Sequence, residues 1–469
     1  MLSGQKSAAG KGLSKLAENR DHAVVIGASI AGLCAAQALA SRFGRVTVVD
    51  RDEIGPETTF RRGAPQGYQP HFLLELGALT LERLFPGFRE RLAAGGVPIG
   101  DFGTLAQFQF PSGYTPLKPT GVFFQTFSRP FLEWHLRSRL LSRHNVGLVG
   151  GFRVESLISE GVPSVVRGVR GRRFGERSDI YADLTVDATG RRSQTSRLVE
   201  GIGVTAVRER VVPADVSYTT RLYRGHPENG LHVFGTYPLA PYQRRGAGIV
   251  AIERDRCMVV MLAADGEPAP KNATEFHEFA KSLPNQFVSK YLREHSPDGD
   301  LHRFSERNNR WRLLHRCKDW PVGLAALGDS VCVFNPLYAQ GMTVAALQAM
   351  ALGECLDRGN CTKLYQKHAA RIVRIPWLLA TTNDLAWRNH QVPLFSRVAS
   401  WYLRRIFDRV PADSALYRQF VRVQHMRSSP TSLLGVGTVA RAFLCTERPS
   451  ATPFPACPFA SDPPTARAD

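Results

Sequence analysis

Residues 21–54, DHAVVIGASIAGLCAAQALASRFGRVTVVDRDEI, constrain the fold of this chain more than any other segment. The apolar run at 23–26 predicts a buried strand, and a glycine-containing turn leads from it into an alanine-rich helix that extends to about residue 41. The apolar run at 45–50 predicts a second strand. This strand–helix–strand order within about 30 residues is typical of a parallel sheet with its helix packed on one face.

The turn between the first predicted strand and the helix is a dinucleotide-binding fingerprint. Gly27 allows the tight turn, and Gly32 lets the helix pack closely on the strand. The start of the helix presents free N–H groups to a pyrophosphate, and Asp50, at the end of the second strand, can accept hydrogen bonds from a ribose diol. Ser29 stands where a glycine is usual, and its small side chain still permits a phosphate to approach. The residues predicted to hold the nucleotide are Gly27, Ser29, Ile30, Ala31, Gly32, Asp50 and Arg51.

Two later segments indicate which dinucleotide is bound. Residues 184–193, LTVDATGRRS, form a predicted strand that runs into a turn, and residues 328–342, GDSVCVFNPLYAQGM, follow another predicted strand. We expect Asp329 to hold a ribityl hydroxyl and Pro336 to lie against a flat ring. Gly341 and Met342 open a helix, whose free N–H groups would stabilise negative charge at the pyrimidine edge of a reduced flavin.

In their order and separation, these segments resemble the motifs of the FAD-dependent monooxygenases of the aromatic-hydroxylase superfamily, over roughly residues 21–445. Residues 127–133, FSRPFLE, resemble the start of a helix whose arginine approaches the cofactor in that family, which implies a cofactor contact for Arg129. Val154 would lie near the adenine. The resemblance also implies that Arg62, next to Arg61, lies near the cofactor, where the pair would guard the flavin or receive a nicotinamide cofactor.

The chain is most similar to the squalene-epoxidase-like branch, which includes epoxidases of polyether antibiotic biosynthesis of the lasalocid and monensin type. The similarity rests on APQGYQPH at 64–71, DATG at 187–190, NPLYAQGM at 335–342 and a helical C-terminus near IPW at 375–377. Thr189 replaces the aspartate of the usual Asp-Gly motif, and Ala339 replaces the first glycine after Pro336. The implied cofactors are FAD and NAD(P)H, with electrons delivered directly or through a separate flavin reductase.

The implied fold is α/β, with a Rossmann-type FAD-binding domain, an inserted, mainly antiparallel substrate-binding sheet and a C-terminal helical region. Apolar residues alternate with period 2 across 205–265, as in an antiparallel sheet. The expected bounds are 21–85, 120–205 and 310–355 for the FAD domain, 86–119 and 206–309 for the sheet, and 356–445 for the helices. Residues 1–20 are expected to form a flexible leader, and 446–469 a disordered, proline-rich tail.

The resemblance implies transfer of one oxygen atom from a flavin C4a-hydroperoxide to carbon–carbon double bonds of an apolar polyene, a polyketide or an isoprenoid, in secondary metabolism. No Ser/His/Asp set or paired carboxylates are evident, so no catalytic side chain is assigned and the cofactor is expected to perform the chemistry. Hydroxylation of a phenol or aromatic polyketide and reduction of isoprenoid double bonds remain open. A flavin halogenase is disfavoured, because the chain has no Trp-x-Trp-x-Ile-Pro segment and no Lys within 16–117.

Aromatic residues indicate where a substrate would lie. Phenylalanines crowd between residues 102 and 131, and the spacing of Phe108 and Phe110 places both on one face of a strand. Such a cluster forms either the core of a sheet or the wall of an apolar cavity over the flavin. The candidates for the substrate pocket are Phe108, Phe110, Tyr218 and Tyr338.

Charge and composition narrow the range of partners. The chain carries 60 Lys and Arg against 41 Asp and Glu, a formal net charge of +19. The basic residues are scattered, without a recognised nucleic-acid-binding motif, so no nucleic-acid partner is expected. Arginine excess is typical of a GC-rich genome; the alternative is an acidic partner, such as a carrier protein that holds the substrate. Apolar runs end well before the ~18 residues of a transmembrane helix, and the absence of CxxC speaks against a metal site and favours the cytoplasm.

Overall fold

A parallel sheet carries the segments that were predicted to bind the nucleotide. The structure is a computed structural model that describes residues 20–58, 60–61, 63–162, 164–227, 229–241, 243–359, 362–387 and 394–444. The sheet has the strand order β19-β13-β1-β2-β9, and each neighbouring pair is parallel. Gly27 and Asp50 directly follow two of these strands, so they lie at the same edge. The strands are β1 (His22–Ile26), β2 (Arg45–Val49), β9 (Val146–Val149), β13 (Leu184–Asp187) and β19 (Leu324–Ala326).

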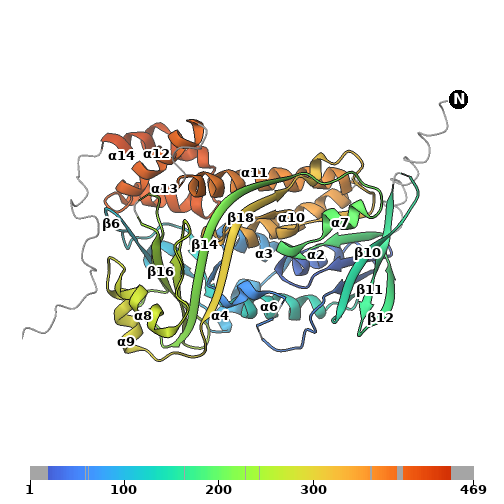
Figure 1. Ribbon diagram of the computed structural model, residues 1–469, viewed down its shortest axis with the longest axis horizontal. Coiled ribbons are helices and arrows are strands. Elements are labelled where there is room, and N and C mark those ends of the chain that lie inside the picture. The colour runs from blue at the N-terminus through green and yellow to red at the C-terminus, as the bar shows by residue number, and fades with distance from the viewer. Residues whose placement is uncertain are drawn as a thin grey trace, which may run out of the picture.

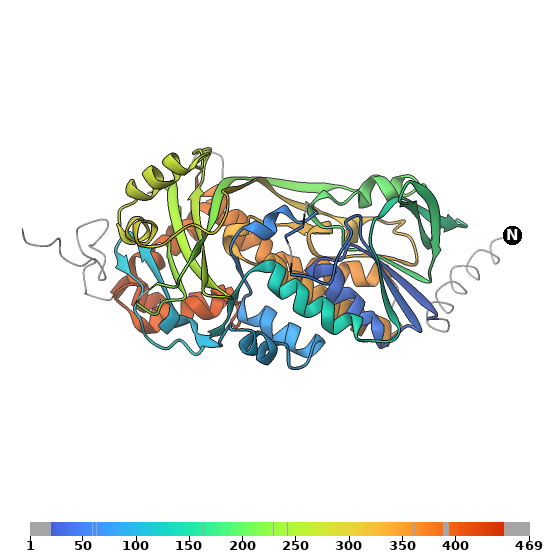
Figure 2. The same ribbon diagram turned by 90° about the horizontal axis from the view of Figure 1, so that it is seen from below.

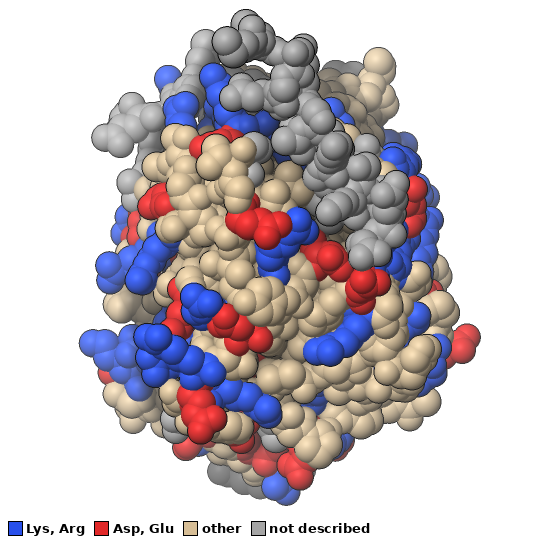
Figure 3. Space-filling view, turned by 90° about the vertical axis from the view of Figure 1, so that its right-hand side faces the viewer, with Lys and Arg blue, Asp and Glu red and all other residues tan. Residues whose placement is uncertain are grey.

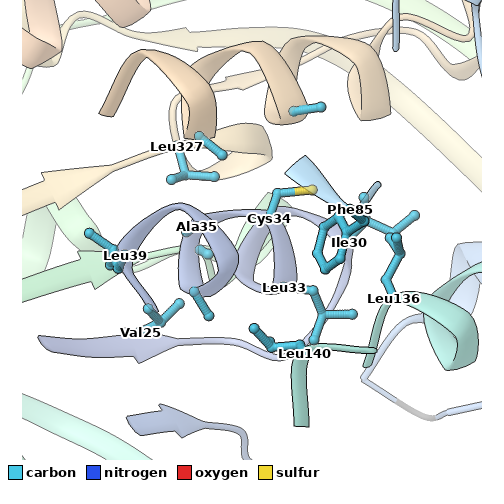
Figure 4. Packing of buried hydrophobic residues seen from close by; sticks show 14 of the residues in the cluster. Val25, Ile30, Leu33, Cys34, Ala35, Leu39, Phe85, Leu136, Leu140 and Leu327 are labelled. Carbon is cyan, nitrogen blue, oxygen red and sulfur yellow. The ribbon is translucent and has the colours of Figure 1, made fainter. Parts of the chain in front are cut away.

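Helices cover one face of this sheet. The predicted alanine-rich helix is α2 (Ile30–Ala40), which packs between the sheet, α6 (Arg129–Leu141) and α10 (Gly341–Asp357). Figure 4 shows Leu33 of α2 near Leu136 and Leu140 of α6. The helix approaches the strand very closely at Gly32, where an added Cβ would lie 1.7 Å from the carbonyl oxygen of Gly27.

A three-stranded antiparallel sheet covers the opposite face. Its strands are β10 (Phe152–Glu160), β11 (Val165–Arg173) and β12 (Glu176–Tyr181), and they form one end of the molecule in Figure 1. Leu157, Val166 and Val169 from this sheet share a buried cluster with Val24 and Ile26 of β1. Because β1 is buried on both faces, its sequence is a continuous apolar run and does not alternate.

An eight-stranded, mainly antiparallel sheet forms the other half, with the strand order β20-β18-β14-β17-β16-β15-β5-β6. Its exception is the pair β5–β15, which is parallel. The long strands β14 and β18 run from this half toward the parallel sheet (Figure 1). The strands are β5 (Ala106–Phe110), β6 (Gly113–Tyr114), β14 (Glu209–Arg224), β15 (Val233–Thr236), β16 (Arg245–Ile252), β17 (Arg256–Ala263), β18 (His302–Arg312) and β20 (Cys332–Val333).

The two faces of this sheet pack against different helices. Ile249 on β16 belongs to a cluster with α8 (Ala273–Lys281) and α9 (Phe287–Glu294), whereas its neighbour Val250 packs in a cluster with α12 (Leu394–Arg409) and α13 (Ser414–Gln424). Successive side chains of a strand point to opposite faces, which explains this division. Figure 2 shows the two helical groups on opposite sides of the sheet.

The C-terminal helices are also joined to the parallel-sheet half. Helix α3 (Glu75–Leu84) begins without a side-chain cap from its own segment. Instead, the N–H of Glu75 donates to Nδ1 of His425, and the N–H of Leu76 donates to the carbonyl oxygen of His425. His425 directly follows α13, and α11 (Thr362–Leu385) and α14 (Val436–Leu444) complete the C-terminal helices.

Short elements connect these layers. The helices are α4 (Phe88–Ala94), α5 (Phe102–Leu105) and α7 (Thr195–Glu200), and the 3₁₀ turns are η1 (Pro65–Tyr68), η2 (Gly190–Arg192), η3 (Leu314–Arg316), η4 (Gly328–Ser330), η5 (Pro336–Tyr338) and η6 (Pro430–Leu434). Two short antiparallel pairs join β3 (His71–Phe72) to β8 (Thr126–Phe127) and β4 (Gly100–Asp101) to β7 (Phe123–Phe124).

The mixed α/β architecture, the large mainly antiparallel sheet and the C-terminal helices are confirmed. The Rossmann-type assignment and the domain bounds stay predictions, and the sheet crosses those bounds, because β20 lies within 310–355. Helices α8 and α9 were not predicted. Residues 1–19 and 445–469, which include most of the predicted leader and the whole tail, lie outside the described residues. No helix within the described ranges is long and apolar enough to cross a membrane.

Candidate active site

A cavity of about 870 Å³ lies between the two halves of the molecule. Asp50, Arg51 and Val154 line one end, at the edge of the parallel sheet. Phe108 and Phe234 line the other end, on the eight-stranded sheet. The same cavity therefore reaches from the predicted nucleotide-binding segments to an apolar surface.

The structure brings most of the predicted cofactor residues to the wall of this cavity. Gly32 is not at the wall, because it faces Gly27 in the contact between helix and strand. Arg62 lies outside the described residues. Contacts of the other residues with a cofactor stay predictions. The predicted cofactor residues that line the cavity are Gly27, Ser29, Ile30, Ala31, Asp50, Arg51, Arg129, Val154, Asp329, Pro336, Gly341 and Met342.

The N-terminus of α2 lacks a side-chain cap, although Ser29 occupies the capping position. The hydroxyl of Ser29 donates to Oε1 of Glu133 at 2.5 Å and accepts a hydrogen bond from Arg129 at 2.8 Å. It is therefore turned away from the helix, and the first N–H groups of α2 have no partner within the helix. These N–H groups, at the cavity wall, can bind an anion.

Glu133 holds two arginines at the cavity. Its carboxylate accepts from Nε of Arg129 at 2.9 Å and from Arg61 at 2.8 Å. Burial alone would raise the pKa of Glu133, but the guanidinium groups of Arg129 and Arg61 lower it to about 2. Glu133 is therefore ionised and fixes both guanidinium groups beside the uncapped helix, where Arg61 also pairs with Asp50 at 3.5 Å and with Asp52 at 3.9 Å. Residues 127–133 were noted in the sequence, but no role was predicted for Glu133.

His71 stays neutral in this network. Its Nδ1 lies 2.8 Å from the carbonyl oxygen of Gln69 and its Nε2 lies 3.2 Å from Arg129. A guanidinium only donates, so Nε2 accepts and Nδ1–H donates to Gln69. Burial, together with the charge of Arg129, lowers the pKa of His71 to about 3. His71 therefore orients Arg129 and carries no charge near neutral pH.

Asp329 and the start of α10 also line the cavity. Asp329 follows β19, and Gly341 opens α10, where an added Cβ would lie 3.6 Å from Oδ1 of Asp329. Burial raises the pKa of Asp329, against the opposing charges of Arg129, Arg191 and Arg312. Like α2, α10 has no side-chain cap. A second set of free N–H groups thus lies at the cavity.

Two of the four predicted pocket residues, Phe108 and Tyr218, line the apolar end. Phe110 does not: its ring stacks on Phe407 of α12 at 5.4 Å, because it lies two residues further along β5, beneath the C-terminal helices. Tyr338 does not line the cavity either, because its hydroxyl donates to Asp384 of α11 at 2.8 Å. The remaining apolar lining comes from strands far apart in the sequence, with Val233, Phe234, Val250, Val260 and Leu262 among its residues.

Charges of both signs cover the face at the β10–β12 end. Figure 3 shows Lys and Arg interspersed there with Asp and Glu. Arg170 pairs with Asp179 at 2.6 Å and Arg167 with Glu160 at 2.6 Å on these strands. The expected acidic partner therefore stays a prediction. Within the described ranges, no cluster of three or more His, Cys, Asp or Glu could hold a metal ion.

No protein-family model matches the chain. The chain is 30% identical over 451 residues to Protein Rv3254 of Mycobacterium tuberculosis (strain ATCC 25618 / H37Rv), and the match covers 90% of this chain and 93% of that protein. It is 28% identical over 404 residues to Squalene epoxidase 4 of Arabidopsis thaliana, with 81% of this chain and 72% of that protein covered.

Solved structures share the fold at lower identity. The flavin-dependent brominase Bmp2 superposes with a TM-score of 0.62 at 14% identity, covering 86% of this chain and 93% of that chain. The p-nitrophenol 4-monooxygenase PnpA from Pseudomonas putida DLL-E4 gives a TM-score of 0.61 at 15% identity, covering 88% of this chain and 99% of that chain. The architecture is therefore one shared by flavin-dependent monooxygenases and halogenases.

Proposed function

Because the chain belongs to the same family as Protein Rv3254 of M. tuberculosis and has the fold of flavin-dependent monooxygenases, we propose that it is an FAD-dependent monooxygenase. We propose further that it epoxidises one or more carbon–carbon double bonds of an apolar polyene, a polyketide or an isoprenoid. The observation that carries this proposal is that a single cavity joins the dinucleotide motifs to an apolar sheet face.

The residues at the motif end fit FAD. The N-termini of α2 and α10 lack side-chain caps and lie at the cavity, where they suit the pyrophosphate and the pyrimidine edge of a flavin. Gln340, which directly precedes α10, has a buried Oε1 atom without a partner. When bound, FAD supplies the activation of molecular oxygen, which side chains alone do not provide.

The side chains of the cavity would then bind, orient and exclude water. Asp50 and Asp329 would accept hydrogen bonds from cofactor hydroxyls. Arg129, held by Glu133, would place its positive charge beside the pyrophosphate. At the other end, the apolar sheet face would exclude water and hold the substrate against the flavin.

The titratable groups near the apolar end favour an alkene over a phenol as substrate. Hydroxylation of a phenol usually requires a group that takes its proton, whereas epoxidation of an alkene does not. Burial, with the charge of Arg129, lowers the pKa of His71 to about 3, and burial raises the pKa of Tyr218 well above its ordinary value. Glu306 is paired with Arg191 at 2.6 Å. His71 and Tyr218 are therefore not set to take a proton near neutral pH, and the charge of Arg191 opposes the rise that burial causes in the pKa of Glu306.

The cavity also bears on halogenation. The flavin-halogenase alternative implies a lysine near the flavin, whereas the residues described at the wall of this cavity include no lysine. This difference favours oxygenation over halogenation.

A labelled-oxygen experiment tests the proposal. The purified protein with FAD and NADPH, with and without an added flavin reductase, would be incubated under ¹⁸O₂ with squalene, shorter polyenes and phenols. We expect polyene products that each contain heavy oxygen. A gain of two hydrogens without oxygen would indicate a reductase, and hydroxylated phenols with unreacted polyenes would indicate an aromatic hydroxylase. Turnover without the added reductase would show that NADPH reacts directly.

A further inference from the structure

A buried carboxylate from the C-terminal helices lies behind the apolar end of the cavity. Asp384, on α11, is 5% exposed. One of its oxygens accepts from Nδ2 of Asn309 at 2.6 Å, and the other accepts from Nδ2 of Asn335 and from the hydroxyl of Tyr338, both at 2.8 Å. No sequence motif pointed to Asp384, because these partners lie 46 to 75 residues away along the chain.

Two of the three donors belong to residues 335–338, the segment that leads into α10. Pro336 and Leu337 of this segment line the cavity. Asn335 is fully buried, and its N–H donates to Oδ1 of Asn309 at 2.7 Å. Asp384 and Asn309 together therefore fix both the side chains and the backbone of the segment against which the flavin is expected to lie.

The carboxylate also sets the orientation of Asn335. A carboxylate only accepts, so the amide of Asn335 must present Nδ2 to Asp384 and Oδ1 to the other side. There, Oδ1 accepts from the hydroxyl of Tyr218 at 3.3 Å and from the N–H of Leu337 at 3.1 Å. The chain of contacts thus extends from α11 to a tyrosine at the cavity wall.

We propose that Asp384 is a positioning residue of the active site, which fixes the 335–338 segment and the Tyr218 hydroxyl in the arrangement that receives the flavin. This assignment rests on the proposed function. It makes the C-terminal helical region a part of the active site, although α11 does not line the cavity.

Protonation would weaken this arrangement. Burial raises the pKa of Asp384 to about 6, despite the hydrogen bonds from Asn309, Tyr338 and Asn335. The titratable groups that face it are Asp215 and Tyr218 on β14 and Tyr338 in η5, and the charge of Asp215 acts in the same direction as burial. Below pH 6 one oxygen of Asp384 carries a proton and accepts less well. The 335–338 segment then loses part of its anchor.

The test measures FAD affinity by quenching of flavin fluorescence, with the full-length protein at pH 8 and pH 5. Asp384→Asn removes the charge but keeps the size, and its new N–H₂ group faces either Asn309 or the Asn335–Tyr338 pair, all of which donate. We expect the variant to bind FAD roughly tenfold more weakly than the wild type at pH 8, the effect of a lost hydrogen bond to a charged group. The FAD affinity of the wild type should fall by a similar factor between pH 8 and pH 5, whereas the FAD affinity of the variant should be the same at both pH values.

Asp408→Asn is the matched control, because Asp408 lies on the neighbouring helix α12 and burial also raises its pKa. Asp408→Asn should have the FAD affinity of the wild type at both pH values. If Asp384→Asn fails to fold, Tyr338→Phe removes one donor and should weaken FAD binding roughly threefold. Unchanged affinity and pH dependence in Asp384→Asn, or in Tyr338→Phe if that variant replaces it, would overturn the positioning role. A wild type that binds no FAD would instead overturn the proposed function.

Discussion

The two ends of the cavity are built in different ways. At the motif end, Gly27, Ser29 and Asp50 come from one strand–helix–strand unit, and Asp329 and Gly341 come from one later segment. At the apolar end, Phe108 comes from β5, Tyr218 from β14, and further lining from β15, β16 and β17. A local sequence pattern therefore specifies the motif end, whereas only the assembled sheet specifies the apolar end.

This difference has a consequence for function. At the motif end, the cavity wall includes a backbone turn and two helix termini. Such features suit a dinucleotide in many enzymes of different specificity. The apolar end is shaped by side chains of several strands and is supported by helices from the C-terminal region. Substitutions at the motif end should therefore affect FAD and all turnover, and substitutions at the apolar end should affect which product forms.

The largest effect should come from the contact between α2 and β1. Gly32→Ala would place a Cβ 1.7 Å from the carbonyl oxygen of Gly27, so helix and strand must separate. We expect the free energy of unfolding to fall by more than about 3 kcal/mol, measured by urea denaturation. Gly147→Ala on β9 is the control, because an added Cβ there meets no atom within 4 Å. Equal stabilities of the two variants would contradict the close packing.

The junction between the C-terminal helices and α3 should make the protein sensitive to acid. Burial lowers the pKa of His425 to about 3 from the ordinary value of 6.5, so this histidine is neutral when folded and charged when unfolded below pH 6.5. Its contribution to stability is complete above pH 6.5 and is lost as the pH falls toward 3. When the pH falls from 7.5 to 4, the loss of this contribution should lower the free energy of unfolding by about 3 kcal/mol.

His425→Gln stays neutral at every pH and should lose less stability over the same interval, as measured by urea denaturation at both pH values. The exposed His144 provides the control, because His144→Gln should retain the wild-type pH dependence. A His425→Gln variant with an unchanged acid response would show that His425 does not couple the C-terminal helices to pH.

A smaller effect is expected on FAD affinity from Asp329. Asp329→Asn keeps the shape of the side chain but removes the charge, so a hydrogen bond from a ribityl hydroxyl would weaken. We expect FAD to dissociate roughly tenfold more readily, as measured by flavin fluorescence. Asp300→Asn, at an exposed position that does not line the cavity, should retain FAD as well as the wild type does. Full retention of FAD by Asp329→Asn after dialysis would remove Asp329 from the cofactor site.

The smallest effects should distinguish Phe108 from Phe110. Phe108→Leu widens the apolar end of the cavity and should change the ratio of products and increase uncoupled peroxide formation. Phe110→Leu loses its stacking on Phe407 and should lower stability by about 1 kcal/mol without changing the product ratio. Product ratios from a polyene, measured by mass spectrometry, separate the two. A change in ratio with Phe110→Leu alone would place the substrate near α12.

The sequence allowed the motif end to be predicted because each of its turns lies within a short segment. It identified Phe108 and Tyr218 at the cavity but also proposed Phe110 and Tyr338, which do not line it. Period 2 predicts which face of β5 a side chain occupies and not what covers that face. The sequence did not predict that His425 would cap α3 from 350 residues away, or that Asp384 would bond Asn335. Such contacts depend on how the C-terminal helices dock, for which the chain has no local pattern.

The most direct test of the central claim is a crystal structure of the protein with FAD and a long polyene analogue. We expect the pyrophosphate at the N-terminus of α2, the flavin ring between Pro336 and the start of α10, and the analogue along Phe108 and Phe234. FAD bound with its ring outside this cavity, or an analogue bound elsewhere while the apolar sheet face contacts only solvent, would contradict the proposed function.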